Sequence, residues 1–372
     1  MTEPLAGLYL HVPFCARVCP YCDFAVRTGD AEKKRAYVET LLAEIDLWAD
    51  WPLAFDTIYF GGGTPSSLEP DDLERIVARV RERFCMADDP WIFLEANPED
   101  VTVDNVAAWK RFGLRTLSLG VQSFDADELA FLGRTHTPDR AREAIAIGRD
   151  AGFHTVAIDL IYGLPDQSTD TWHRRIDTAL ETQPDHLSCY QLTIKAGTRF
   201  GLLEKRGDLT QLHDRGQADV FRATHEHLNA AGYTGYEVSS FAIGDEHRSR
   251  HNRKYWDHTP YLGLGPSAHS YNDDRRWWNL RKMQDWQQRV EQGKPPVESE
   301  ETLSPRERLL ETVMMGLRTY RGIDDAGLVA HNAELVERLC ANGLIKRVGS
   351  RLIPTLDGLA VADSLAAMFR LG

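Results

Sequence analysis

The chain has 372 residues, six cysteines and a formal net charge of −13 at pH 7. Its hydrophobic fraction of 42% is ordinary for a globular protein, and a chain of this length buries a core without disulfide bonds. No apolar run is long enough to span a membrane, the first residues lack the basic start of a secretory signal, and the acidic balance disfavours a nucleic-acid partner. We therefore expect a cytoplasmic protein that binds no nucleic acid.

Short β-rich segments alternate with amphipathic stretches over the first two hundred residues. Strands are predicted at Leu8–Val12, Thr57–Phe60, Trp91–Glu95, Thr116–Leu119, Thr155–Ile161 and Leu187–Thr193, and helices at 31–49, 70–85, 101–112, 138–151 and 168–182. This alternation is typical of an α/β protein with a parallel sheet or barrel. Six strands, rather than eight, favour an open, partial barrel.

The composition changes after residue 295. Gly293-Lys294-Pro295-Pro296 marks a joint, and Ser304-Pro305-Arg306-Glu307 predicts the start of a helix, with a serine cap, an early proline and a glutamate that completes a capping box. Residues 344–353 predict a short hairpin around Gly349-Ser350. Helices combined with a hairpin resemble a winged-helix module, which we expect to serve packing or interaction.

The cysteines fall into two groups. Cys15, Cys19 and Cys22 lie within eight residues, whereas Cys85, Cys189 and Cys340 are isolated and are expected to be small core residues. Three thiols at this spacing can converge from one loop, and thiolates bind zinc, copper(I) or iron–sulfur clusters. Structural zinc favours four ligands in paired CxxC units, and the chain has no second CxxC. A [4Fe–4S] cluster held by three cysteines leaves one iron open to another ligand.

Polar residues and glycines follow successive predicted strands. The cysteine loop follows the first strand, and Gly61-Gly62-Gly63-Thr64-Pro65 follows the second. Glu95 ends the third, Gln122 follows the fourth, and Asp159 lies in the fifth. Because ligands of parallel α/β proteins bind at the carboxyl ends of the strands, we expect one site at this edge.

The CxxxCxxC spacing, with Tyr21 directly before the last cysteine, resembles the radical S-adenosylmethionine superfamily. The resemblance implies that the three cysteines bind a [4Fe–4S] cluster whose open iron takes the amino and carboxylate groups of S-adenosylmethionine. Carboxylates suit the ribose hydroxyls of that cofactor, and an arginine suits its carboxylate. The residues that the resemblance places around it are Tyr9, Tyr21, Gly62, Gly63, Thr64, Glu95, Gln122, Arg134 and Asp159.

Within that superfamily the chain is similar to the group containing oxygen-independent coproporphyrinogen III oxidase and HemW-type haem chaperones. Phe24 stands where the oxidase pattern has a fourth cysteine, and only 14 residues precede Cys15, where the oxidase carries an extension. Residues 251–256, His-Asn-Arg-Lys-Tyr-Trp, match the HNxxYW signature of the HemW branch. The resemblance therefore implies a chaperone that binds haem and delivers it to apo-haemoproteins. The alternatives are a coproporphyrinogen oxidase or other radical oxidoreductase and, disfavoured by the lack of a basic tail, an RNA-modifying enzyme.

The segment around this signature suits haem on its own chemistry. Tyrosines and tryptophans between residues 233 and 278 can pack on a flat macrocycle, and the arginines and lysine at 248, 250, 253, 254, 275 and 276 can pair with propionates. His251 is the predicted axial ligand, with His247, His258 and His269 as competitors. The alternative is that the aromatic residues pack a loop against the barrel, and that the histidine is a hydrogen-bonded spacer.

The implied organisation has three parts: a radical S-adenosylmethionine partial barrel over 1–240, a connecting region over 241–298, and a mostly helical, winged-helix-like domain over 299–372. The implied partners are haem, apo-haemoproteins and a reductant for the cluster. A homodimer and a transient contact with a membrane protein stay open, and no catalytic residue is assigned.

Overall fold

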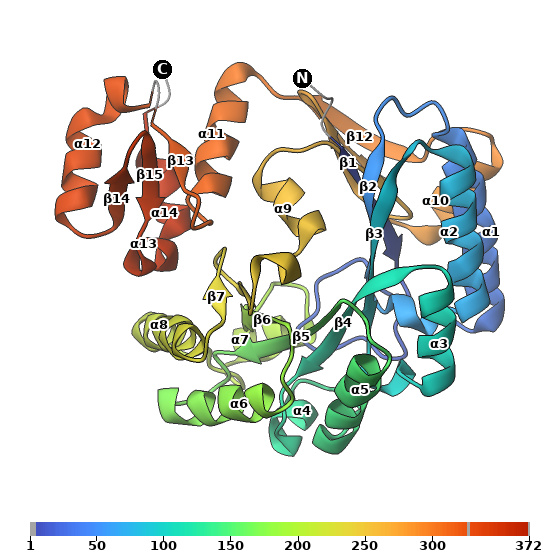
Figure 1. Cartoon of the computed structure of the whole chain (residues 1–372), viewed down its shortest axis with the longest axis horizontal. Helices are drawn as coiled ribbons and strands as arrows, with labels where there is room; N and C mark the ends of the chain where they lie inside the picture. Colours follow the sequence, from blue (N-terminus) through green and yellow to red (C-terminus); the bar gives the residue numbers. More distant parts are fainter. Residues whose placement is uncertain (1–4, 326–327, 371–372) are drawn as a thin grey trace.

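The centre of the molecule is one curved sheet of 12 strands (Figure 1). The structure, a computed structural model, describes residues 5–325 and 328–370. Six neighbouring strands run parallel in chain order: β1 (Ala6–Val12), β2 (Phe55–Gly62), β3 (Met86–Ala96), β4 (Leu114–Gln122), β5 (Thr155–Tyr162) and β6 (His186–Gln191). The predicted α/β partial barrel is confirmed.

Helices on the outer side of the sheet connect these strands (Figure 1). The five predicted helices are present as α1 (Ala31–Leu47), α2 (Pro70–Arg83), α3 (Val103–Arg111), α5 (Pro138–Asp150) and α6 (Thr169–Glu181). Most begin after a side chain that accepts a hydrogen bond from the first turn, as Asp30 does from the amide of Lys33. Additional helices follow at α4 (Ala126–Phe131), α7 (Arg199–Arg206) and α8 (Asp214–Ala230), with short 3-10 turns η1 (Pro65–Ser67), η2 (Pro98–Asp100) and η3 (Asp245–His247).

Strands outside the parallel core widen the sheet at both edges. Beside β1 lies β9 (Tyr261–Leu264), which is parallel to it, and β10 (His269–Asn272), β11 (Arg275–Asn279) and β12 (Val297–Thr302) follow as antiparallel strands. Beyond β6 lie β8 (Ser240–Ala242) and β7 (Thr234–Gly235). Helix α9 (Arg250–Trp256) lies within the curve of the sheet, and α10 (Met283–Glu291) packs beside α1 (Figure 1).

One buried carboxylate joins α1 to this widened edge. Glu44 Oε2 accepts hydrogen bonds from the Gly265 amide at 2.8 Å and from Trp286 Nε1 at 2.9 Å, and its Oε1 accepts one from Asn279 Nδ2 at 2.6 Å. Burial raises the pKa of Glu44 to about 7, although these three donors act in the opposite direction.

The C-terminal part has its own small core beside the barrel (Figure 1). Its elements are α11 (Pro305–Gly316), α12 (Val329–Ala341), α13 (Leu356–Ala360), α14 (Ala362–Met368) and a sheet in the order β13 (Ile323–Asp324), β15 (Arg351–Pro354), β14 (Ile345–Val348). The predicted capping box is present, because Ser304 and Glu307 exchange hydrogen bonds at the start of α11, and the predicted hairpin is β14–β15. Across the described residues, no helix is both long and apolar enough to cross a membrane.

Candidate functional site

A cavity of about 420 Å³ opens at the carboxyl ends of the parallel strands. Its wall is formed by the cysteine loop after β1, the glycine loop after β2 and the ends of β3, β4, β5 and β6. All the predicted site residues except Tyr9 and His251 line it: Cys15, Cys19, Tyr21, Cys22, Gly62, Gly63, Thr64, Glu95, Gln122, Arg134 and Asp159.

The three clustered cysteines are free thiols and are partly exposed. Backbone hydrogen bonds hold their loop in place, from the Cys15 amide to the Arg27 carbonyl at 2.9 Å and from the Cys22 amide to the Cys19 carbonyl at 3.1 Å. Burial raises the pKa of the Cys15 and Cys22 thiols, while Arg134 Nη1 lies 3.7 Å from Cys19 Sγ. The Arg134 guanidinium therefore donates a hydrogen bond toward the cysteine loop.

The donor set fits a cluster. Within the described ranges, no group of three His, Cys, Asp or Glu side chains converges on a point where one ion would sit. A [4Fe–4S] cluster takes one thiolate per iron, so its cysteines surround the cluster instead of meeting at one atom. Cys15, Cys19 and Cys22 all line one open cavity, so each thiolate can take a different iron, and the cavity leaves space for a further ligand.

Glycines allow the loop after β2 to approach the cysteine loop closely. A Cβ on Gly63 would lie 2.7 Å from the Phe14 carbonyl oxygen and 3.0 Å from Cys15 Sγ, and Gly62 has a left-handed φ of 113°. The Gly63 amide donates to the Val12 carbonyl at 2.8 Å, and the Thr64 amide donates to the Phe14 carbonyl at 2.7 Å. The glycines therefore fix the two loops edge to edge and leave backbone exposed to the cavity.

Two partly buried carboxyl groups and one guanidinium face the same space. The Glu95 carboxylate accepts from the Tyr59 hydroxyl at 2.7 Å and from the Gly62 amide at 3.1 Å. Burial raises its pKa, and burial together with the charge of Glu95 raises the pKa of Asp159 to about 7. Arg134 Nη2 donates to Asn97 Oδ1 at 2.6 Å and to the Gly120 carbonyl at 2.8 Å. The cavity can thus accept hydrogen bonds from hydroxyl or amino groups and pair with a carboxylate.

Tyr9 and His251 lie behind the cavity wall. The Tyr9 hydroxyl hydrogen-bonds to His11 Nδ1 at 3.0 Å. His251 has no exposed surface, and its two ring nitrogens hydrogen-bond to Thr57 Oγ1 and to the Tyr255 hydroxyl, each at 2.9 Å. Both ring nitrogens of His251 are therefore hydrogen-bonded, and neither is free to bind haem iron. This arrangement agrees with the alternative that His251 is a hydrogen-bonded spacer.

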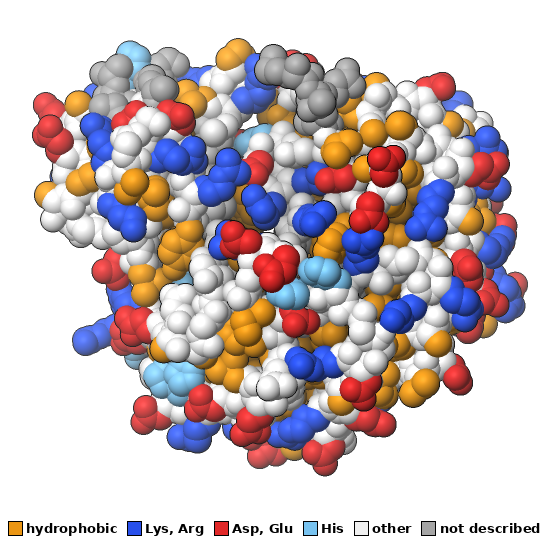
Figure 2. Space-filling view, in the orientation of Figure 1, with side chains coloured by type: hydrophobic (Ala, Val, Ile, Leu, Met, Phe, Trp, Pro, Cys, Tyr) orange, Lys and Arg blue, Asp and Glu red, His pale blue; other side chains and the backbone are white. Residues whose placement is uncertain are grey.

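The basic residues expected to meet propionates are mostly paired with carboxylates. Lys254 and Arg248 form ion pairs of 2.7 Å with Asp56 and Asp245, Arg275 pairs with Glu300, and Arg276 pairs with Glu301 and Glu311. Figure 2 accordingly shows acidic and basic side chains interspersed on the face that contains α9. The basic patch in the sequence is largely neutralised in the folded chain.

The exposed entrance of the cavity, which we call its mouth, was not predicted from the sequence. Phe24 is 65% exposed and Tyr190 is 44% exposed, and both line the cavity with Arg17 and Lys195. A signal was available, since Tyr190 lies in the second half of the sixth predicted strand, Leu187–Thr193, and the carboxyl ends of parallel strands meet. Asn97, which orients Arg134, follows the third strand in the same way.

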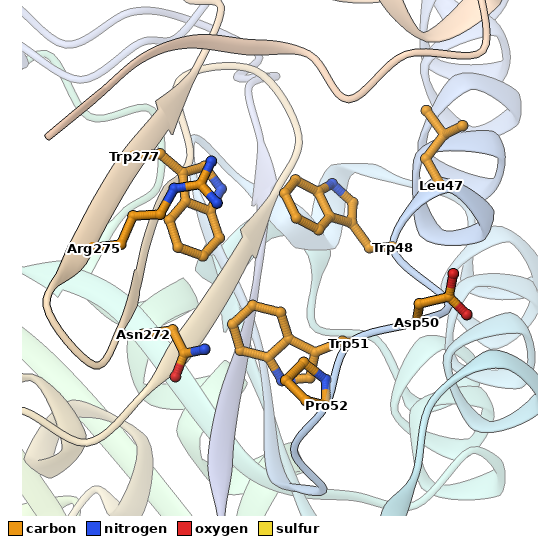
Figure 3. A pocket seen from close by; sticks show the side chains of 8 residues that line it. All are labelled: Leu47, Trp48, Asp50, Trp51, Pro52, Asn272, Arg275 and Trp277. Atoms are coloured by element: carbon orange, nitrogen blue, oxygen red, sulfur yellow. The ribbon is translucent and has the colours of Figure 1, made fainter. Parts of the chain in front are cut away.

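A second pocket, of about 310 Å³, lies at the amino end of β2 (Figure 3). Figure 3 shows the indole rings of Trp48, Trp51 and Trp277 gathered beside Arg275, whose guanidinium lies 5.2 Å from the Trp277 ring centre. The cysteine loop follows the carboxyl end of β1, so this pocket is at the other end of the parallel strands. None of the predicted site residues lines it.

A partial barrel with three cysteines after its first strand defines a radical S-adenosylmethionine protein, and the model of the radical SAM superfamily matches residues 9–179. Among relatives, heme chaperone HemW of Mycobacterium tuberculosis is 36% identical over 367 residues, covering 96% of this chain and 93% of that protein. Heme chaperone HemW of Escherichia coli is 38% identical over 269 residues, covering 72% and 70%. The chain belongs to the HemW family of the radical SAM superfamily.

A solved structure has the same fold over nearly the whole chain. Coproporphyrinogen III oxidase (HemN) from Escherichia coli superposes with a TM-score of 0.85 at 23% identity, covering 98% of this chain and 90% of that one. At this identity the likeness concerns the fold, including the C-terminal module.

Proposed function

We propose that the protein is a haem chaperone that binds a [4Fe–4S] cluster, S-adenosylmethionine and haem, and delivers haem to apo-haemoproteins in the cytoplasm. The observation that carries the proposal is the cavity in which three free thiols share a wall with the Gly62–Thr64 loop, Arg134 and two carboxyl groups. The parts of the proposal that concern haem binding and delivery are supported by the relatives, which are named heme chaperone HemW.

The cofactor residues have separate roles in this proposal. Cys15, Cys19 and Cys22 would hold the cluster, which supplies single electrons when a reductant has loaded it. Arg134 would pair with the carboxylate of S-adenosylmethionine, and Glu95 and Asp159 would accept hydrogen bonds from its polar hydrogens. Gly62, Gly63, Thr64, Tyr21 and Gln122 would form the walls around it.

We place haem at the mouth of the same cavity. The exposed rings of Phe24 and Tyr190 offer flat apolar contacts. Among the described residues, neither the Arg17 guanidinium nor the Lys195 ammonium has an ion-pair partner, so both cations are free to meet propionates. A recipient protein would then approach this open face, while a homodimer or a membrane-protein contact would need a surface elsewhere.

The haem proposal is tested on the full chain, reconstituted with iron and sulfide without oxygen. Added haem should give a Soret band that comigrates with the protein at about one haem per chain, and the band should move to the apo-form of a b-type haemoprotein on mixing. Wild-type protein without stoichiometric haem binding contradicts the chaperone role. Turnover of coproporphyrinogen III with consumption of S-adenosylmethionine would identify the oxidase instead.

The place of haem is tested by paired variants. Phe24→Ala and Lys195→Ala should each weaken haem binding about fivefold, because each removes a stacking or charge contact worth about 1 kcal/mol. Val18→Ala is the matched control, since Val18 is 44% exposed in the same loop but does not line the cavity. Equal haem affinity in all three variants would contradict the proposed haem site at the mouth of the cavity.

A further inference from the structure

Helix α9 carries the HNxxYW signature and lies inside the curve of the sheet (Figure 1). It packs against β1, β2 and the C-terminal helix α11, and its side chains also contact Trp91 and Phe93 of β3. Lys254, which is 8% exposed, pairs with Asp56 at 2.7 Å and donates to the Leu5 carbonyl at 2.8 Å. The helix is therefore attached to the first two strands near their amino ends.

His251 extends from this helix into the barrel wall. Its Nδ1 hydrogen-bonds to Thr57 Oγ1 of β2 at 2.9 Å, and its Nε2 hydrogen-bonds to the Tyr255 hydroxyl at 2.9 Å. A Cβ on Gly7 of β1 would lie 3.0 Å from His251 Cε1, so the ring also fills the space beside that strand. Complete burial lowers the pKa of His251 to about 3, and the imidazole is neutral with one donor and one acceptor nitrogen.

The imidazole ring supports Tyr59, which in turn holds a cavity residue. The rings of His251 and Tyr59 stack with centres 5.0 Å apart and an interplanar angle of 27°. Phe93 stacks on Tyr59 at 5.5 Å, so the phenol has little freedom to turn. Its hydroxyl donates to Glu95 Oε1 at 2.7 Å, and the other Glu95 oxygen accepts from the Gly62 amide at 3.1 Å.

We propose that His251 is a positioning residue of the S-adenosylmethionine pocket: it holds the Tyr59 ring, and the Tyr59 hydroxyl fixes the Glu95 carboxylate that faces the cavity. The inference rests on the proposed binding of S-adenosylmethionine in that cavity. The HNxxYW signature then acts through the wall of the barrel, and haem binds without its histidine. Iron ligation by His251 would require one of these two hydrogen bonds to break, because an iron-bound imidazole keeps only one nitrogen for hydrogen bonding.

The test measures two affinities on the cluster-loaded full chain: that for S-adenosylmethionine by equilibrium dialysis, and that for haem by its Soret band. His251→Ala should weaken S-adenosylmethionine binding about tenfold, and Tyr59→Phe about threefold, because the Glu95 carboxylate loses a fixed orientation. Haem affinity should stay within about twofold of wild type in both. His331→Ala, at an exposed histidine of α12 that belongs to neither site, is the control and should change neither affinity.

A double variant separates positioning from general damage. Because both side chains act through Glu95, His251→Ala with Tyr59→Phe should bind S-adenosylmethionine about as weakly as His251→Ala alone. If His251→Ala does not fold, Thr57→Val replaces it, since it removes only the partner of Nδ1 and should weaken binding about threefold.

Unchanged S-adenosylmethionine affinity in the single variants, or losses that multiply in the double variant, would overturn the inference. Loss of haem binding in His251→Ala with intact S-adenosylmethionine affinity would overturn it as well, and would make His251 a haem ligand. Wild-type protein that binds no S-adenosylmethionine would instead refute the proposed function of the cavity.

Discussion

Glu44 illustrates at the scale of one residue how the barrel tolerates a carboxyl group in its core. Three donors from three separate segments converge on its two oxygens: the Gly265 amide, Asn279 Nδ2 and Trp286 Nε1. All of these segments belong to the part of the chain that widens the sheet beyond β1. The side chain therefore stabilises the attachment of that part to α1.

Replacing Glu44 with alanine should lower the free energy of unfolding by about 3 kcal/mol, because three buried donors lose their acceptor. Urea unfolding followed by circular dichroism measures this loss. Glu39→Ala is the control on the same helix, where the exposed pair with Arg75 should contribute less than about 1 kcal/mol. Equal losses in the two variants would contradict the structural role of Glu44.

Substitution of a clustered cysteine and of an isolated cysteine should have different effects on the iron–sulfur cluster. Cys19→Ser should abolish the broad absorbance of the reconstituted cluster at about 400 nm, because a [4Fe–4S] cluster with only two thiolates is not retained. Cys85 is exposed and outside the cavity, so its prediction as a core residue was wrong, and Cys85→Ser should keep the absorbance. A retained band in Cys19→Ser would remove that residue from the ligand set.

At the scale of elements, strand β9 depends on close backbone contact. A Cβ on Gly263 would lie 2.1 Å from the His269 carbonyl oxygen, which is part of the backbone of β10 and cannot rotate away. Gly263→Ala should therefore cost about 3 kcal/mol of stability by forcing β9 and β10 apart. Gly293→Ala meets no atom within 4 Å and has only a left-handed φ of 69°, so it should cost about 1 kcal/mol. Thermal unfolding of both variants measures the difference, and a smaller loss in Gly263→Ala would contradict this account.

The parallel core was predictable from sequence because its strands and helices alternate with clear periodicities. The edge strands were not, since residues 261–279 mix tyrosines, tryptophans and arginines without a regular alternation. Strand β3 also begins earlier than predicted, at Met86, because its pairing with β2 shifts between Phe55 and Thr57 and accommodates Pro90. A shift of this kind depends on the neighbouring strand and has no local signal.

The candidate site also contains residues that could be predicted from the sequence and residues that could not. Residues at strand ends, such as Gly62, Glu95 and Asp159, could be placed from the sequence because parallel strands end at one edge. His251 could not, since the histidine-rich segment folds back to the amino ends of β1 and β2, and only the tertiary structure shows that Thr57 and Tyr255 occupy both ring nitrogens.

At the scale of the whole molecule, buried carboxyl groups and buried histidines have opposite effects on stability as pH falls. The folded-state pKa of Glu44, about 7, is above its usual 4.5, so its contribution is full below about pH 4.5 and is lost as pH rises through 7. Burial lowers the pKa of His225 from 6.5 to about 4, so its contribution is present above about pH 6.5 and is lost as pH falls toward 4.

The opposite pH dependence of these two contributions to stability is tested with two variants, each unfolded at two pH values. Glu44→Ala should cost about 2 kcal/mol more at pH 5 than at pH 7, because wild-type Glu44 becomes protonated in the folded state over that interval. His225→Ala should cost less at pH 5 than at pH 7, because the wild-type unfolded chain gains a proton there that the folded chain does not. Urea midpoints that move in the same direction for both variants would contradict the assignment.

The position of β9 next to β1 has a consequence for the order of events during synthesis. Strand β1 leads directly into the cysteine loop, yet one of its two partners, residues 261–264, is made some 250 residues later. A nascent chain that ends before β9 therefore exposes an unpaired edge of β1 at the base of the loop. Iron and sulfide supplied to such a chain would meet thiols on an unfinished wall, so the cluster should be inserted after translation has passed residue 264.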